Sequence, residues 1–151
     1  MTQPVSPLTE HLGFWLRTVS NHVSHAFAAK VAAKDVTVAE WVVMRSPYGT
    51  GPKAPSRLAA EIGMTRGAIT KLADRLIAKS LIVRRSSTED GRSQTLSLTK
   101  RGNELVPDLA ALADRNDAEF FNHLPPDDRR RLEQLLKRLV ERSRMTAIPI
   151  D

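Results

Sequence analysis

Residues 65–102, TRGAITKLADRLIAKSLIVRRSSTEDGRSQTLSLTKRG, change their periodicity halfway along. Apolar residues from Ile69 to Leu76 are spaced i, i+3, i+4 and i+7, which is the spacing of one face of a helix. After Ser80 the pattern becomes that of short strands. The stretch therefore predicts a helix over residues 66–79 and a β-hairpin over residues 81–99.

The hairpin is predicted from two apolar runs and a polar tip. Leu81, Ile82 and Val83 begin the first strand, and residues 94–99 alternate apolar and polar side chains as a half-buried second strand does. Between them lies a polar segment that contains Asp90-Gly91, a dipeptide typical of tight turns.

A second short helix is predicted just upstream. Pro55 suits the first turn of a helix, where its missing N–H costs nothing. Gly63 suits the left-handed backbone that ends a helix, and Thr65 can cap the next one. Two helices joined at such a turn form a helix-turn-helix, and the hairpin that follows makes it winged.

Helices are also predicted on both sides of this unit. Residues 8–31 read as one long amphipathic helix, and Thr37 with Glu40 forms a capping box for a helix that stops before Ser46-Pro47. Residues after 101 are helical, with a break near Leu124. The predicted fold class is mainly α with a small β-hairpin wing. Residues 1–34 form an N-terminal dimerisation helix, 35–100 the winged helix-turn-helix, and 101–151 C-terminal dimerisation helices.

The positive charge is concentrated in the winged unit. Net charge is +6, and residues 53–101 alone hold eleven basic and four acidic residues, a net of +7. A basic centre with near-neutral flanks points to a polyanionic partner. No apolar run of about 20 residues and no signal peptide is evident, so a cytoplasmic location is expected.

Several chemistries find no support in the sequence. The chain has no cysteine, which excludes disulfides and thiolate metal ligands. It also lacks a Gly-rich phosphate loop, a G-x-S-x-G elbow and an H-E-x-x-H motif, so an enzyme is not expected. No cofactor is expected. His11, His22 and His25 are too loosely spaced, and lack the carboxylate support, to favour a zinc site.

Recognition of a major groove needs small or hydrogen-bonding residues on the exposed helix and cations near it. The outward face of residues 66–79 supplies them, and Asp90 can brace Arg92 at the hairpin tip for a minor groove. The candidate DNA-binding residues are Ser56, Thr65, Arg66, Gly67, Thr70, Lys71, Arg75, Arg84, Arg85, Asp90 and Arg92. Arg66, Thr70 and Lys71 are candidates for base edges, whereas Ser56 and Arg75 are candidates for phosphate.

The sequence resembles the multiple antibiotic resistance regulator (MarR) family. The resemblance is carried by Arg57-Leu58-Ala59, residues 65–76 and 81–85, and above all residues 90–102, which match the wing pattern D-x-R then L-x-L-T-x-x-G. It implies a homodimer whose terminal helices interlock, a pseudo-palindromic operator on double-stranded DNA, and release by small aromatic ligands in many members. One departure is Ser80, which stands where the family usually has glycine. A serine there would either adopt a left-handed backbone at a cost in free energy or alter the turn.

Two further sets of residues complete these expectations. The apolar stripes of the terminal helices predict a homodimer interface of Leu12, Leu16, Leu132, Leu135, Leu136 and Leu139. A ligand pocket between the dimer platform and the DNA-binding lobe, as the resemblance implies, would be lined by His11, Phe14, Trp15, Trp41, Met44 and Tyr48. Packing in the hydrophobic core is the favoured interpretation of these six residues, because aromatic residues at helical spacing usually fill cores.

The favoured function is therefore a sequence-specific DNA-binding transcriptional regulator, with repression as the expected mode of action. The alternative is a winged helix that binds RNA or another protein without operator specificity. A winged helix that binds another protein usually presents apolar residues on its recognition face. The outward face of residues 66–79 is instead basic and polar. That difference favours DNA.

Overall fold

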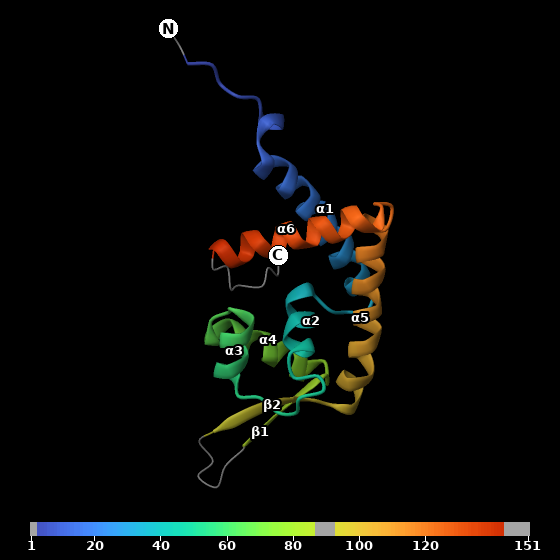
Figure 1. Ribbon diagram of the computed structural model, residues 1–151. Helices are drawn as coiled ribbons and strands as arrows, with labels where there is room; N and C mark the ends of the chain where they lie inside the picture. Colours follow the sequence, from blue (N-terminus) through green and yellow to red (C-terminus); the bar gives the residue numbers. More distant parts are fainter. Residues whose placement is uncertain (1–2, 87–92, 144–151) are drawn as a thin grey trace.

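The computed structural model describes residues 3–86 and 93–143 of the chain (Figure 1). A 3-10 turn, η1 (Leu8–Glu10), precedes the long helix α1 (Leu12–Ala32). The lobe that follows consists of α2 (Val38–Arg45), α3 (Pro55–Ile62), α4 (Arg66–Ala78), β1 (Ile82–Ser86) and β2 (Gln94–Leu98). The chain continues through α5 (Lys100–Phe121) and α6 (Pro126–Ser143).

The terminal helices stand outside the lobe. In Figure 1 the lobe lies in the lower half with the hairpin at its base, and α5 runs up its side. The N-terminal part of α1 projects away from the rest of the molecule, and α6 crosses above the lobe. Helix α1 packs on α5, and α4 packs on both α2 and α3. This arrangement leaves one face of α4 and most of the length of α6 uncovered.

The core lies inside the lobe and extends to its supporting helices. Fully buried residues come from four elements of the lobe: Val43 from α2, Leu58 from α3, Ile69 and Leu76 from α4, and Leu96 from β2. Val31 of α1 and Leu109 of α5 are fully buried as well, which ties these two helices to the lobe. The predicted inner face of the recognition helix is confirmed, because Leu72 and Ala73 are also buried.

The local capping signals are confirmed. Thr37 Oγ1 accepts a hydrogen bond from Glu40 N at 3.1 Å, and Glu40 Oε1 accepts one from Thr37 N at 3.0 Å, which is a capping box. Gly63 ends α3 with φ 81°, in the left-handed region. Thr65 Oγ1 caps α4 by accepting from Ala68 N at 3.1 Å.

The long first helix is shorter than predicted. Residues 8–10 form the separate turn η1, whose backbone bonds run i to i+3, from Glu10 N to Pro7 O and from His11 N to Leu8 O. His11 then takes an extended backbone (φ −97°, ψ 125°), which interrupts the helical bonding before α1 begins at Leu12. The predicted wing is also trimmed, because Leu81 precedes β1 and Thr99 follows β2.

The wing is an antiparallel pair in which Ile82 faces Leu98 and Ser86 faces Gln94. Its second strand has a further backbone partner, Lys53, that the sequence pattern does not indicate. Lys53 N donates to Leu96 O at 3.0 Å, and Leu96 N donates to Lys53 O at 2.8 Å. The loop between α2 and α3 is therefore bonded to the wing, which fixes the hairpin against the helices. Within the described residues, no helix is long and apolar enough to cross a membrane.

Candidate nucleic-acid interface

A polar hollow of about 580 Å³ lies between α3, α4 and the wing. Four residues predicted from the sequence to contact DNA line it together: Ser56, Arg66, Thr70 and Arg84. They come from three elements that are separated along the chain. Asp74, Ser93 and Gln94 also line the hollow, and none of the three is among the DNA-binding residues predicted from the sequence.

Helix α4 presents these side chains because its opposite face is anchored in the core. Burial of Ile69, Leu72, Ala73 and Leu76 fixes the rotation of the helix about its axis. Thr65, Arg66, Gly67, Thr70 and Lys71 are consequently exposed. A Cβ added at Gly67 would meet only Thr65 Oγ1, at 4.0 Å, so the fold itself does not require a glycine there.

The hydroxyl of Thr70 is partly committed within its own helix. Its Oγ1 donates to the carbonyl oxygen of Arg66 at 2.9 Å. Its oxygen remains able to accept a hydrogen bond, for example from a base amino group. Arg66 and Lys71 have no carboxylate within 4.0 Å among the described residues, so their charges face outward uncompensated there.

Arg84 reaches from the wing to the recognition helix. Its Nη2 lies 2.9 Å from Asp74 Oδ1. Arg84 is paired in the sheet with Leu96, which is fully buried, so its stem starts at the core and its guanidinium ends in the hollow. Arg85, the next residue, is exposed. Asp90 and Arg92, predicted for the wing tip, lie outside the described residues.

Arg75 faces a different part of the molecule. Its Nη2 lies 3.8 Å from Oε1 of Glu40, which is fully buried, and it lines a cleft together with residues of α1 and α5. It does not line the polar hollow. Lys79 lies one turn further along the same stripe and contacts Glu40 at 3.0 Å. This stripe of α4 is directed at α2.

Glu40 keeps its charge in spite of complete burial. Burial raises the pKa of its carboxyl group, but hydrogen bonds from Lys79 and from Thr37 outweigh that effect and leave the pKa lowered. Because Lys79 also donates to Asp35 O at 2.7 Å, the end of α4 is joined to the α1–α2 turn as well. The recognition helix is therefore held at its C-terminal end by a buried ionic link.

A second ionic cluster holds α3 beside α2 and the wing. Lys53 is almost fully buried, and its Nζ lies 2.8 Å from Glu61 Oε2 and 3.0 Å from Ser46 O. Arg57 Nε contacts Glu61 Oε1 at 2.9 Å. Hydrogen bonds from Lys53, then from Arg57 and Ser46, lower the pKa of Glu61 to about 2. Lys53 is thus a structural cation, although it contributes to the basic excess of this segment.

The six residues predicted for a ligand pocket are not brought together. Met44 is fully buried in the core, as the favoured interpretation, core packing, predicted for it. Phe14 and Trp15 stack edge to face near the projecting end of α1, and Tyr48 lies under the guanidinium of Arg45. His11 is exposed. Of the six, only Trp41 lines the large cleft, because the sequence pattern does not show which faces of the helices meet.

That cleft, of about 720 Å³, opens between α1, α2 and α5. Its walls are mainly apolar, with Phe27, Trp41 and Val42 among them, and His25, Arg75 and Asn116 supply polar groups. Asn116 is buried and donates to Val23 O at 3.1 Å while accepting from Lys30 Nζ at 2.9 Å. Among the described residues, no group of three or more His, Asp or Glu side chains is arranged to hold a metal ion.

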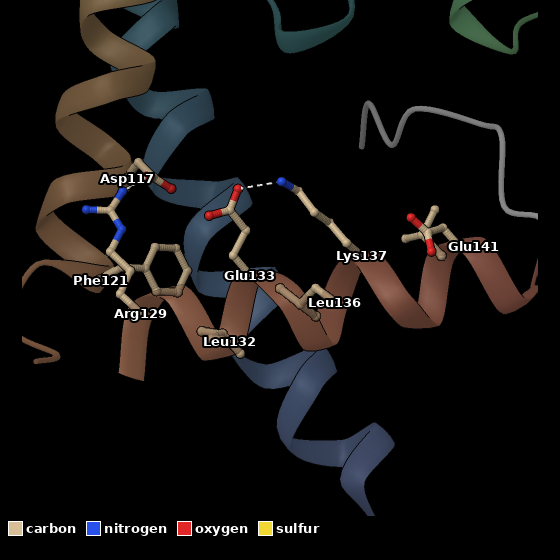
Figure 2. Close-up of a pocket in the computed structure, with 9 residues that line it drawn as sticks. Asp117, Phe121, Arg129, Leu132, Glu133, Leu136, Lys137 and Glu141 are labelled. Carbon is tan, nitrogen blue, oxygen red and sulfur yellow. Dashed lines mark hydrogen bonds and ion pairs between the residues drawn. The ribbon is translucent and has the colours of Figure 1, made fainter. Parts of the chain in front are cut away.

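A third hollow, of about 490 Å³, lies at the elbow of α5 and α6. Figure 2 shows Leu132 and Leu136 of α6 beside Phe121 of α5, with charged side chains around them. Arg129 Nη2 lies 2.6 Å from Asp117 Oδ2, and Lys137 Nζ lies 2.9 Å from Glu133 Oε1.

The residues predicted for a dimer interface are, with one exception, exposed in the single chain. Leu12 is 87% exposed and Leu139 is 54% exposed. Leu16, Leu135 and Leu136 are also exposed, and Leu132 is half-buried at the elbow. Trp15, Val19 and Val140 extend the same two stripes.

The fold and the basic surface on α4 and the wing define a winged helix-turn-helix protein. The model of the MarR family matches residues 36–94, which cover α2 to the start of β2. Over these residues, which make up less than half of the chain, the sequence is similar to the MarR family.

The chain is also similar to a named regulator in sequence. The chain is 28% identical over 99 residues to the uncharacterized HTH-type transcriptional regulator YkoM of Bacillus subtilis (strain 168). That match covers 66% of this chain and 64% of YkoM, slightly under two thirds of the relative's length.

Two solved structures are similar over most of their length. A probable transcriptional regulator from Pseudomonas aeruginosa is 26% identical with a TM-score of 0.77, over 88% of this chain and 99% of that one. A cysteine-to-serine mutant of MarR from E. coli, complexed with operator DNA, is 25% identical with a TM-score of 0.76, over 85% and 93% of the two chains.

Proposed function

We propose that this chain is a sequence-specific regulator of transcription that binds double-stranded DNA as a homodimer and acts as a repressor. The observation that carries the proposal is the polar hollow, in which Ser56, Arg66, Thr70 and Arg84 meet from α3, α4 and the wing. The N-terminal part of a recognition helix is where base edges are read. The complex of the similar E. coli MarR with operator DNA supports the same assignment.

The roles of the individual residues follow from their places. Arg66, Thr70 and Lys71 are exposed near the start of α4 and are assigned to the major groove, where arginine and lysine pair with guanine. Ser56 and Arg85 are assigned to phosphates. Arg92, oriented by Asp90, is assigned to the minor groove beside the wing.

Arg75 is the residue whose proposed role changes. Its position beside Glu40 and the cleft favours a link between α4 and α2 over a phosphate contact. Replacing Arg75 is then expected to alter the placement of α4 rather than to remove one phosphate contact.

Selection of bound sequences from random duplexes tests the proposal most directly. A dimer is expected to select a pseudo-palindrome whose half-sites are about one DNA turn apart, on the order of 34 Å. Arg66→Ala should lower operator affinity and relax the preference at one base position. Lys34→Ala, which removes an exposed cation from the α1–α2 turn, is the matched control. Preference for single-stranded RNA over duplex DNA would favour the alternative module instead.

The homodimer is proposed from the exposed apolar stripes of α1 and α6. A second copy could cover them together with the α5–α6 elbow, because these surfaces are neighbours at one end of the molecule (Figure 1). Large exposed apolar patches of this kind mark interaction surfaces. Sedimentation at micromolar concentration should show a dimer, and Leu139→Glu should shift it toward monomer. Ala60→Glu, on the exposed side of α3, should not.

The cleft beside Trp41 is the proposed site of a small aromatic effector. Its volume falls within the range of about 300–1,000 Å³ typical of ligand sites, and its walls combine apolar and polar groups in the usual way. Salicylate serves as the probe: it should weaken operator binding and change the fluorescence of Trp41. Ala28→Phe, at the cleft wall, should reduce that response while leaving operator affinity unchanged. No effect of salicylate on either readout would count against this site.

A further inference from the structure

Asp74 is an acidic residue on the surface assigned to DNA. It follows Arg66 by eight positions and Thr70 by four, so the three residues lie on one stripe of α4. All three line the polar hollow, and among the described residues that line it Asp74 is the only one with a negative charge. Its side chain is 60% exposed. The fold therefore does not bury this carboxylate, and solvent or DNA can reach it.

The carboxylate of Asp74 compensates a cation of the same surface. Its Oδ1 lies 2.9 Å from Nη2 of Arg84, which is 32% exposed and comes from the wing. A phosphate that approaches Arg84 must therefore compete with a carboxylate that is already in place. If the ion pair stays intact, Asp74 repels the phosphate; if it opens, the hydrogen bond is lost.

This competition affects two kinds of complex unequally. Binding to arbitrary duplex depends almost entirely on phosphate contacts and on the counterions they release. A complex with the preferred sequence also contains base contacts, which hold α4 in one orientation in the groove. Carboxylates can accept a hydrogen bond from the amino group of cytosine there. The penalty from Asp74 therefore acts in full on arbitrary duplex and can be offset on the preferred one.

We propose that Asp74 is a specificity-determining residue that lowers the affinity of the chain for arbitrary duplex DNA by occupying Arg84. This inference rests on the proposed function. It assigns to the Asp74–Arg84 pair a role in discrimination between sequences, in addition to joining the wing to the recognition helix.

The test compares Asp74→Asn with the wild type on two duplexes, the selected operator and one of random sequence, over a series of salt concentrations. Asparagine keeps an oxygen that can accept from Arg84, but it removes the charge. One additional phosphate contact steepens the slope of log affinity against log salt concentration by about 0.9. Between 1 M and 0.1 M salt, the affinity of the variant should therefore rise by about eightfold more than that of the wild type. The variant should show this gain on random duplex, and the ratio of operator to random affinity should fall.

Two controls separate discrimination from other effects. Asp108→Asn makes the same change of net charge at an exposed position of α5, and it should leave both slopes unchanged. Adding Arg84→Gln to Asp74→Asn should remove the gain and return the salt slope on random duplex to that of the wild type. If Asp74 served only to hold the wing, Asp74→Asn would instead weaken binding to both duplexes, and that result would overturn the inference.

The outcomes also distinguish this inference from the proposed function. If the wild type binds neither duplex, the proposed function fails and the inference fails with it. If the wild type selects an operator but Asp74→Asn matches Asp108→Asn on random duplex, only the inference is wrong.

Discussion

Glu40 Oε2 and Lys79 Nζ lie 3.0 Å apart and join the first turn of α2 to the residue that ends the recognition helix. Glu40 is fully buried, whereas the Lys79 side chain is 26% exposed. The same carboxylate belongs to the capping box of α2, so one side chain both starts a helix and positions another. Placement of α4 against the rest of the lobe therefore depends on this pair.

Removing the Lys79 side chain should lower the free energy of unfolding, because the carboxylate of Glu40 stays buried without this partner. Removing one partner of a buried ion pair typically costs about 3–5 kcal/mol. Thr37 and Arg75 still contact Glu40, so we expect Lys79→Ala to lower the free energy of unfolding by about 2–3 kcal/mol. Urea denaturation measures this. Lys71→Ala, two turns earlier on the exposed side of the same helix, should change stability by less than about 0.5 kcal/mol. Equal effects of the two substitutions would show that the Glu40–Lys79 pair contributes nothing to the free energy of unfolding.

Replacing Ser80 by a smaller residue should increase the stability of the folded protein. Its φ of 61° lies in the left-handed region, which costs roughly 1–2 kcal/mol for a residue with a Cβ. Glycine removes that strain but gains freedom in the unfolded chain, so Ser80→Gly should stabilise the protein by about 0.5–1 kcal/mol. Thr99 Oγ1 donates to the backbone oxygen of Ser80, a contact that the substitution keeps. Thermal denaturation should show a higher Tm. A lower Tm would indicate that the serine hydroxyl makes a contact worth more than the strain.

Gly102 is a position where a larger residue should not fit. A Cβ there would lie 2.2 Å from the backbone oxygen of Leu81, and backbone cannot move aside as a side chain can. We expect Gly102→Ala to cost roughly 1–3 kcal/mol, the range for overpacking a buried site. Denaturant unfolding of the variant measures the loss. Gly13→Ala serves as the control, because an added Cβ meets nothing within 4 Å there. A stable Gly102→Ala protein would mean that the start of α5 can shift away from Leu81.

Glu61 should make stability depend on pH in the acidic range. Lys53 and Arg57 lower its pKa from 4.5 to about 2 in the folded protein. A lowered pKa gives stability that is complete above pH 4.5 and is lost as the pH falls toward 2. The difference in unfolding free energy between the wild type and Glu61→Gln should therefore be largest near neutral pH and shrink across that interval. A difference that is constant from pH 7 to pH 2 would contradict the assigned pKa.

Features that depend on neighbours along the chain were predicted well. Residue types and their spacing predicted the caps at Thr37 and Thr65, the left-handed turn at Gly63 and the inner face of α4. Each of these features depends on residues within about two helical turns. The DNA-facing set was partly predicted for the same reason. Once the buried stripe of α4 is known, the exposed stripe follows from geometry.

Features that depend on packing between distant segments were missed. Spacing identified Arg75 as exposed but could not show that α2 brings Glu40 to it, thirty-five residues earlier in the chain. Lys53 counted as part of a basic surface, yet it is almost fully buried against Glu61 and Ser46. The six residues predicted for a pocket were grouped on the family resemblance, which does not show how their side chains pack. Only the packing of the helices shows that Met44 faces the core and Trp15 faces outward.

The sequence by itself determined a winged helix-turn-helix with a basic recognition face, because periodicity, caps and turn residues act over short distances. The tertiary structure decided which charges of that face are available. Arg84 is held by Asp74 from another element, Arg75 and Lys79 are directed at Glu40, and Arg66 and Lys71 face outward. The physical reason is that an ion pair depends on separation in space, and helix spacing specifies only which side of its own element a residue occupies.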